Sequence, residues 1–144
     1  IYMYWPDSLK RICDYNPEAR IVAILRHPVY RAYSQWKMQV VRGDEKLSFE
    51  EAMSEAGRRR ILENERDSRR FSYMERGFYG KQVEAMIDLF PRHPPLIVTS
   101  DDLRRDPAEI LTRICRLLSI DAASIPHHRP GYIVAVDSRS VPDI

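Results

Sequence analysis

The sequence contains little of what would mark a membrane, metal-binding or nucleic-acid-binding protein. No apolar run is longer than Ile21–Leu25, so no segment is long enough to span a bilayer. There are only two cysteines, without CxxC or histidine spacing, which favours structural thiols in a reducing, cytoplasmic setting and gives a metal site almost no support. The net charge of +2 is too small to indicate a nucleic-acid partner.

The sequence also lacks an initiator methionine, and no signal peptide is visible in it. It begins in the middle of a pattern, at "IYMYWP", so we expect part of a longer protein or only its ordered residues. Its 144 residues are enough for one domain with a sizeable core. A hydrophobic fraction of 44% with a charged fraction of 31% is typical of a soluble globular protein.

Helical and strand-like patterns alternate along the chain. Two short buried strands, rich in branched apolar residues, are predicted at residues 20–26 and 94–100. Helices are predicted before, between and after them, and strands joined by helical crossovers pair in parallel, which predicts an α/β layer fold. A parallel sheet normally needs more than two strands, so we expect further strands outside this sequence. The tail, residues 121–144, shows no clear period, although "GYIVAV" is compatible with an edge strand.

Local signals define several helix starts. Ser48 and Glu51 form a capping box, and Asp106 with Glu109 forms a second one, followed by Pro107 in the first helical position. Pro28 likewise suits the first position of a helix. The apolar stripe of that helix is predicted to consist of Val29, Tyr33, Trp36 and Val40.

Arg26 stands where the first buried strand ends, just before the helix that Pro28 begins. In an open α/β sheet, ligands bind beyond the carboxyl ends of the strands, and the first turn of a helix favours an anion. Arg26 can donate two parallel hydrogen bonds to a phosphate, and Ser34, about 140° around the helix from Val29, can add a hydroxyl. These residues predict a phosphate site. The spacing alone leaves open that Arg26 pairs with a carboxylate and Ser34 is solvated.

Residues 57–70, "GRRRILENERDSRR", carry many charges of both signs. Such a stretch is typical of a solvated helix or a mobile loop. The alternative is a lip over a substrate site, in which Arg58, Arg59 and Arg60 would face an acidic acceptor. The mixed charge weakens that second interpretation.

The segment "RIVAILRHPVYRAYS" resembles the R-x-P-x-x-R-x-x-S element of sulfotransferases that use 3′-phosphoadenosine 5′-phosphosulfate. Three further segments resemble the heparan sulfate and bacterial branch of that family, in the same order. They are "YMYWPDSLKRICDYNPEARI", "RGFYGKQVEAMIDLFP" and "LIVTSDDLRRDPAEILTRICRLLSI". The resemblance covers nearly the whole chain, which makes it far stronger than one short motif.

This resemblance implies a P-loop-type three-layer fold, with a parallel sheet flanked by helices, seen as an incomplete domain over residues 1–144. It implies that Arg26 and Ser34 bind the 3′-phosphate of the nucleotide, while Arg31 is structural. It also implies sulfuryl transfer to a hydroxyl or amine without a metal ion. His27 is interpreted as a wall residue of the site rather than a general base.

The sequence departs from the family pattern in two respects. The glycine-rich nucleotide loop with its lysine is expected before residue 1, together with the first strand and the general base. We therefore assign no catalytic residue. We also expect residues 1–144 alone to be inactive. "DDL", at residues 101–103, stands where a glutamate is common.

Two other functions remain open at this point, namely a nucleotide- or phosphate-binding module without chemistry of its own and a kinase-like phosphoryl transferase. The second would need G-x-x-x-x-G-K-[ST] and a magnesium-binding aspartate, which are not recognised here. The acceptor is equally open among small molecules, lipids, glycans and protein tyrosines. The oligomeric state is not predicted.

Overall fold

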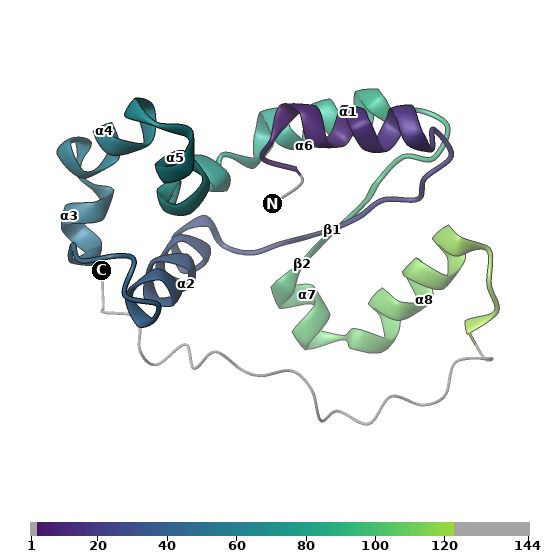
Figure 1. The fold of residues 1–144 in the computed structure, drawn as a ribbon. Helices are drawn as coiled ribbons and strands as arrows, with labels where there is room; N and C mark the ends of the chain where they lie inside the picture. The colour runs from purple at the N-terminus through teal and green to yellow at the C-terminus, as the bar shows by residue number, and fades with distance from the viewer. Residues whose placement is uncertain (1–2, 123–144) are drawn as a thin grey trace. The chain divides into compact units, whose positions relative to one another are not determined.

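The computed structural model describes residues 3–122, and these divide into two compact units (Figure 1). The first unit contains residues 3–26 and 80–122 of the described chain, and the second contains residues 27–79. The boundary between the units therefore falls between Arg26 and His27, inside the segment that the sequence marks as a phosphate site.

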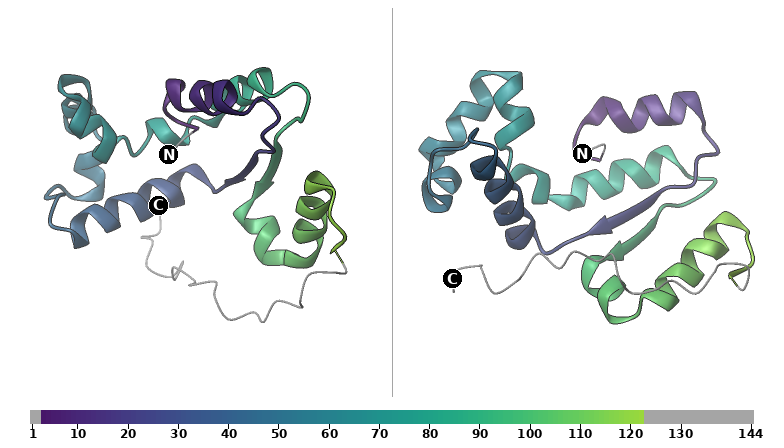
Figure 2. Two further views of the ribbon diagram at one scale, coloured as in Figure 1. Left: turned by 45° about the vertical axis from the view of Figure 1, so that its right-hand side comes forward. Right: turned by 60° about the horizontal axis from the view of Figure 1, so that its bottom comes forward.

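The first unit is built on two parallel strands. They pair in register from Val22 opposite Leu96 to Leu25 opposite Thr99. Helices lie on both faces of this small sheet, with α1 and α6 on one side and α8 on the other (Figure 2). The parallel pairing and the α/β class are thus confirmed. The elements of this unit are α1 (Pro6–Tyr15), β1 (Val22–Leu25), α6 (Tyr79–Leu89), β2 (Leu96–Thr99), α7 (Ser100–Arg105) and α8 (Pro107–Leu118).

Apolar side chains form the core of the first unit. Met86 and Phe90, from α6 and its end, are each only 1% exposed, and they pack with Leu9 of α1. Partly buried residues of β1 and β2, among them Ala23 and Ile97, complete this cluster. These contacts bury one face of α6 against α1 and the two strands.

The second unit is helical. Each α-helix of this unit, and the turn after α5, contributes one residue to its buried core. These residues are Ala32, Ala52, Ile61, Phe71 and Tyr73. Trp36, Leu47, Phe49 and Met53 pack against this core. The elements of this unit are α2 (Pro28–Val41), α3 (Phe49–Met53), α4 (Glu55–Glu63), α5 (Glu65–Phe71) and the short 3₁₀ turn η1 (Glu75–Gly77).

The first predicted capping box is confirmed, and the second is confirmed only in part. Ser48 and Glu51 form the full box. The side chain of Asp106 accepts a hydrogen bond from the Glu109 N–H at 2.9 Å, whereas the Asp106 N–H donates to the Asp102 carbonyl. The helix that begins at Phe49 ends at Met53, because Ser54 caps the next helix with its side chain.

The predicted stripe of α2 is wrong at its two ends. Val29 is 37% exposed and Val40 39% exposed, whereas Ala32 and Gln39 are the buried residues of this helix. The amide of the buried Gln39 donates to the Arg70 carbonyl at 3.3 Å. The proposed edge strand at "GYIVAV" lies outside the described residues. Within residues 3–122, no helix is both long and apolar enough to cross a membrane.

Candidate functional site

Arg26 follows β1 directly, at the edge of the sheet where both strands end. The last residue of β1, Leu25, pairs with Thr99, the last residue of β2, so the parallel register brings both carboxyl ends to the same edge. The Arg26 side chain is half-buried there. This is the edge at which open α/β sheets bind ligands, as the sequence predicts for Arg26.

The second unit begins with the start of α2. His27 is the N-cap, Pro28 occupies the first helical position, and no side chain caps the first turn. A helix of 14 residues presents N–H groups and a positive dipole end at this point. Ser34 is half-buried on the same helix. Arg26 and Ser34 belong to different units, so their joint role at one phosphate stays a prediction.

Arg31 has a structural environment. Its guanidinium donates to the backbone carbonyl of Tyr73 and, at 2.8 Å, to the side-chain oxygen of Gln35. Gln35 in turn donates to the Arg70 carbonyl at 2.8 Å. Burial lowers the pKa of the Arg31 guanidinium, as desolvation of a charged group requires. These contacts tie α2 to the segment after α5 and agree with a structural role for Arg31.

Gly77 lies against the first turn of α2. A Cβ atom added at Gly77 would lie 3.1 Å from the Cβ of Pro28 and 3.9 Å from the Nε of Arg31. The segment "RGFY", residues 76–79, is therefore brought next to the start of "HPVYR". No local pattern in the sequence predicts this contact, since the two segments are far apart in the chain.

The arginines of the predicted acceptor lip are paired within the second unit. Arg58 donates to Glu75 at 2.8 Å, and Arg59 to Glu55 at 3.1 Å. Arg60 binds Glu45 with both terminal nitrogens and stacks over the ring of Phe71, with its carbon 4.2 Å from the ring centre. The stretch folds as α4 and α5. Arg58 and Arg60 bind carboxylates of other segments of this unit, which favours the interpretation without an acceptor.

Glu45 is a buried carboxylate that the sequence did not single out. It is 4% exposed and accepts hydrogen bonds from Arg60, from the Tyr73 hydroxyl at 2.8 Å, and from two backbone N–H groups. Burial acts to raise the pKa of Glu45, but the hydrogen bonds outweigh it, and the pKa lies below its ordinary value. Burial and the bond to Glu45 raise the pKa of Tyr73, which keeps its proton as the donor.

The remaining titratable candidates have local partners. His27 is exposed, and its ring lies 5.0 Å from that of Tyr30. His93 is within 2.9 Å of Glu18. Cys13 and Cys115 are both free thiols, the first donating to the Leu89 carbonyl. In the part of the chain that the structure describes, no group of histidine, cysteine and carboxylate side chains is arranged to hold a metal ion.

The chain has clear likenesses to known proteins. A model of the Sulfotransferase family matches residues 4–124. The bifunctional heparan sulfate N-deacetylase/N-sulfotransferase 3 of Homo sapiens is 30% identical over 140 residues, and that of Mus musculus is 29% identical over 140 residues. A crystal structure of a sulfotransferase from Alicyclobacillus acidocaldarius superposes with a TM-score of 0.69 at 27% identity.

These likenesses cover most of this chain and a part of each relative. The alignments cover 95% of this chain and 15% of each curated relative, and the superposition covers 90% of this chain and 53% of the solved one. The predicted family and the P-loop-like α/β fold are confirmed by them.

Proposed function

We propose that this chain, which belongs to the sulfotransferase family, binds the 3′-phosphate of 3′-phosphoadenosine 5′-phosphosulfate in an enzyme that transfers a sulfuryl group to a hydroxyl or amine. The observation that carries this proposal is the placement of Arg26 directly after β1, at the edge where both parallel strands end. The match to the family and its relatives favours this function over a binding module or a phosphoryl transferase.

The residues present fit a phosphate ligand. Arg26 supplies a fixed positive charge and a planar pair of donors, which suit two phosphate oxygens. The first turn of α2 begins two residues later and offers N–H groups that no side chain caps. Ser34 adds a hydroxyl donor on the same helix. We therefore propose that a doubly charged 3′-phosphate accepts hydrogen bonds from Arg26, from the first N–H groups of α2 and from Ser34.

Contacts within the second unit hold the start of α2 in place. Arg31 ties α2 to the carbonyl of Tyr73, and Gly77 allows residues 76–79 to approach Pro28 closely. When bound, the nucleotide supplies the sulfuryl group: the acceptor oxygen or nitrogen bonds to sulfur, the bond from sulfur to the phosphate oxygen breaks, and the acceptor releases a proton. The contribution proposed for this chain is to bind and orient the nucleotide.

Titration calorimetry with adenosine 3′,5′-bisphosphate tests the proposal. A hydrogen bond to a charged group is worth roughly 1.5–3 kcal/mol, so Arg26→Ala should weaken binding at least about a hundredfold. Arg26→Lys should recover only part of the loss, because lysine keeps the charge without the planar fork. Ser34→Ala should weaken binding roughly tenfold.

Arg42→Ala is the matched control, since it removes the same charge from the exposed residue that ends α2. It should leave affinity for the bisphosphate nearly unchanged. Equal losses from Arg26→Ala and Arg42→Ala would mean that only the net charge matters, and the proposed phosphate site would be wrong.

A further inference from the structure

Arg31 differs in its partners from three other half-buried arginines of the second unit. Each of those three binds a carboxylate, namely Arg58 with Glu75, Arg60 with Glu45 and Arg70 with Asp44. The guanidinium of Arg31 instead donates to two neutral groups, the backbone carbonyl of Tyr73 and the side-chain oxygen of Gln35. Within residues 3–122, no ion pair includes Arg31, so the described chain leaves its positive charge without a carboxylate partner.

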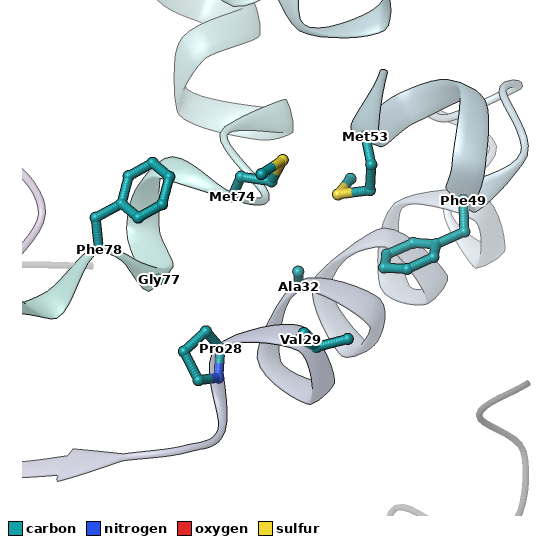
Figure 3. A pocket seen from close by; sticks show the side chains of 8 residues that line it. All are labelled: Pro28, Val29, Ala32, Phe49, Met53, Met74, Gly77 and Phe78. Atoms are coloured by element: carbon teal, nitrogen blue, oxygen red, sulfur yellow. The ribbon is translucent and has the colours of Figure 1, made fainter. Parts of the chain in front are cut away.

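The guanidinium of Arg31 lies beside the first residue of α2. A Cβ atom added at Gly77 would be within 4 Å of both the Pro28 Cβ and the Arg31 Nε, so these two atoms flank the same point. Long side chains of a helix point back toward its N-terminus, which agrees with this placement. Figure 3 shows Gly77 and Pro28 next to a pocket whose lining residues include no carboxylate. The charge of Arg31 therefore lies at the N-terminal end of the helix.

The first turn of α2 has no negative charge to offset this arginine. It contains no acidic residue, and no side chain caps it. The helices α3, α4 and α5 of the same unit each have a glutamate in the first turn. The N-terminus of a helix carries partial positive charge, so a cation is unfavourable there and an anion is stabilising. The helix dipole and the charge of Arg31 thus add, and an anion bound at the start of α2 is stabilised by both.

The charged neighbours of Arg31 do not remove its charge. Glu75 is one of them, and its carboxylate binds Arg58 at 2.6 Å. Burial lowers the pKa of Arg31, while Tyr79 and Glu75 act to raise it and Arg76 acts to lower it further. Arginine nevertheless keeps its proton in proteins. Arg31 is thus a permanent, half-buried charge whose hydrogen-bond partners are neutral.

We propose that Arg31 supplies positive charge to a phosphate bound at the start of α2, and that it therefore sets the affinity for the nucleotide as well as the position of the helix. This inference rests on the proposed sulfotransferase function. Both terminal nitrogens of Arg31 donate within the protein and its Nε is buried, so it acts through space and is not a direct ligand. Ser34 lies about one turn further along the same helix, so the proposed hydroxyl ligand and this charge belong to one element.

Calorimetric titration with adenosine 3′,5′-bisphosphate tests this role. Arg31→Gln should weaken binding about tenfold, because one charge acts through partly aqueous surroundings on a doubly charged phosphate. The loss should shrink to about twofold in about 1 M salt, where the screening length is only about 3 Å. Arg31→Lys keeps the charge and should bind within about threefold of the unmodified protein. Arg70→Gln is the matched control, since Asp44 binds this half-buried arginine at 2.8 Å, and it should leave affinity unchanged.

Urea unfolding of the same variants separates the charge of Arg31 from its structural contacts. Arg31→Lys and Arg31→Gln both disturb the hydrogen bonds to Tyr73 and Gln35, so both should be less stable than the unmodified protein. Only Arg31→Gln should lose affinity for the bisphosphate. If affinity follows stability in both variants, or if the loss in Arg31→Gln is the same in high salt, Arg31 is only structural and the inference is wrong.

Gln35→Glu provides a second test that leaves Arg31 in place, should Arg31→Gln not fold. Its carboxylate would retain the contact with Arg31, which measures 2.8 Å, and would neutralise the charge. The bisphosphate should then bind about tenfold more weakly, and unchanged binding would overturn the inference. Binding by the unmodified protein that the Arg31 and Gln35 variants match contradicts this inference alone. If the unmodified protein does not bind the bisphosphate at all, the proposed sulfotransferase function itself is contradicted.

Discussion

In the first unit the core consists of apolar side chains between helices and two strands, whereas in the second unit a carboxylate is buried among helices. Met86 and Phe90 dominate the first core, and its ion pairs, such as Glu18 with Arg92, lie at the surface. In the second unit, Glu45 sits at 4% exposure between Arg60 and Tyr73. The two units should therefore respond to different kinds of mutation and to different conditions.

The two units also position candidate binding residues in different ways. The first unit offers a strand end, where topology alone places Arg26. The second unit offers the start of α2, whose position depends on contacts between distant segments, such as Arg31 with Tyr73 and Gly77 with Pro28. A site of the first kind follows from the fold class, whereas a site of the second kind follows only from the packed structure.

Removing the largest apolar side chain of the first core should have the greatest effect. Phe90→Ala should lower the free energy of unfolding by about 3–5 kcal/mol, because it removes a ring that is 1% exposed and leaves a cavity. Urea unfolding measures this change. Ile87→Ala, on α6 at 46% exposure, should cost less than about 1 kcal/mol. Similar costs for both would mean that Phe90 is not the centre of this core.

The corresponding test of the second unit is Glu45→Gln. It leaves Arg60 without its carboxylate and should lower the free energy of unfolding by about 3 kcal/mol. Hydrogen exchange should show faster opening within residues 27–79. Glu50→Gln, on the exposed side of α3, is the control and should change stability by less than about 0.5 kcal/mol. A loss spread equally over both units would contradict the contrast drawn between them.

Acid should weaken the Glu45 contribution. The pKa of Glu45 is lowered on folding, so its stabilisation is present above the ordinary value of 4.5 and is lost as the pH falls through the lowered value. The difference in unfolding free energy between the unmodified protein and Glu45→Gln should therefore shrink below pH 4.5. Urea titrations at several pH values measure it. A difference that stays constant down to the lowest pH would show that Glu45 does not titrate in this way.

The smallest of these effects concerns Gly77. Gly77→Ala should destabilise by about 1–2 kcal/mol, since the new methyl group meets the rigid ring of Pro28 at 3.1 Å. Gly80→Ala offers a matched control, because nothing lies within 4 Å of a Cβ at that helical position. It should be neutral or slightly stabilising. Thermal unfolding of the two variants compares them, and equal melting temperatures would remove the argument for close packing at Gly77.

Local signals predicted much of the fold. The capping box of Ser48 and Glu51 and the cap at Asp106 depend on residues a few positions apart, and the structure has both of them. The parallel pairing of β1 and β2 followed from a general rule of chain connection. Arg26 could be placed for the same reason, because the end of a strand is visible in the sequence.

The rest depends on contacts that no local pattern reveals. The buried Gln39 donates to the Arg70 carbonyl, and the buried Glu45 lies between Arg60 and Tyr73. The sequence of residues 57–70 fits both a solvated stretch and an acceptor lip, since a sequence shows charge but not the partner of each charge. The contact of Arg31 with the Tyr73 carbonyl likewise arises only where α2 meets the segment after α5.

Nucleotide selectivity tests the central claim, that Arg26 binds the 3′-phosphate, most directly. Calorimetric titration of adenosine 3′,5′-bisphosphate and adenosine 5′-monophosphate into the protein and into Arg26→Ala measures four affinities. The bisphosphate should bind at least about a hundredfold more tightly to the unmodified protein, because charge-assisted hydrogen bonds hold its extra phosphate, and Arg26→Ala should remove most of that gap. If the unmodified protein binds both nucleotides equally, Arg26 is a structural residue and the proposed phosphate site is wrong.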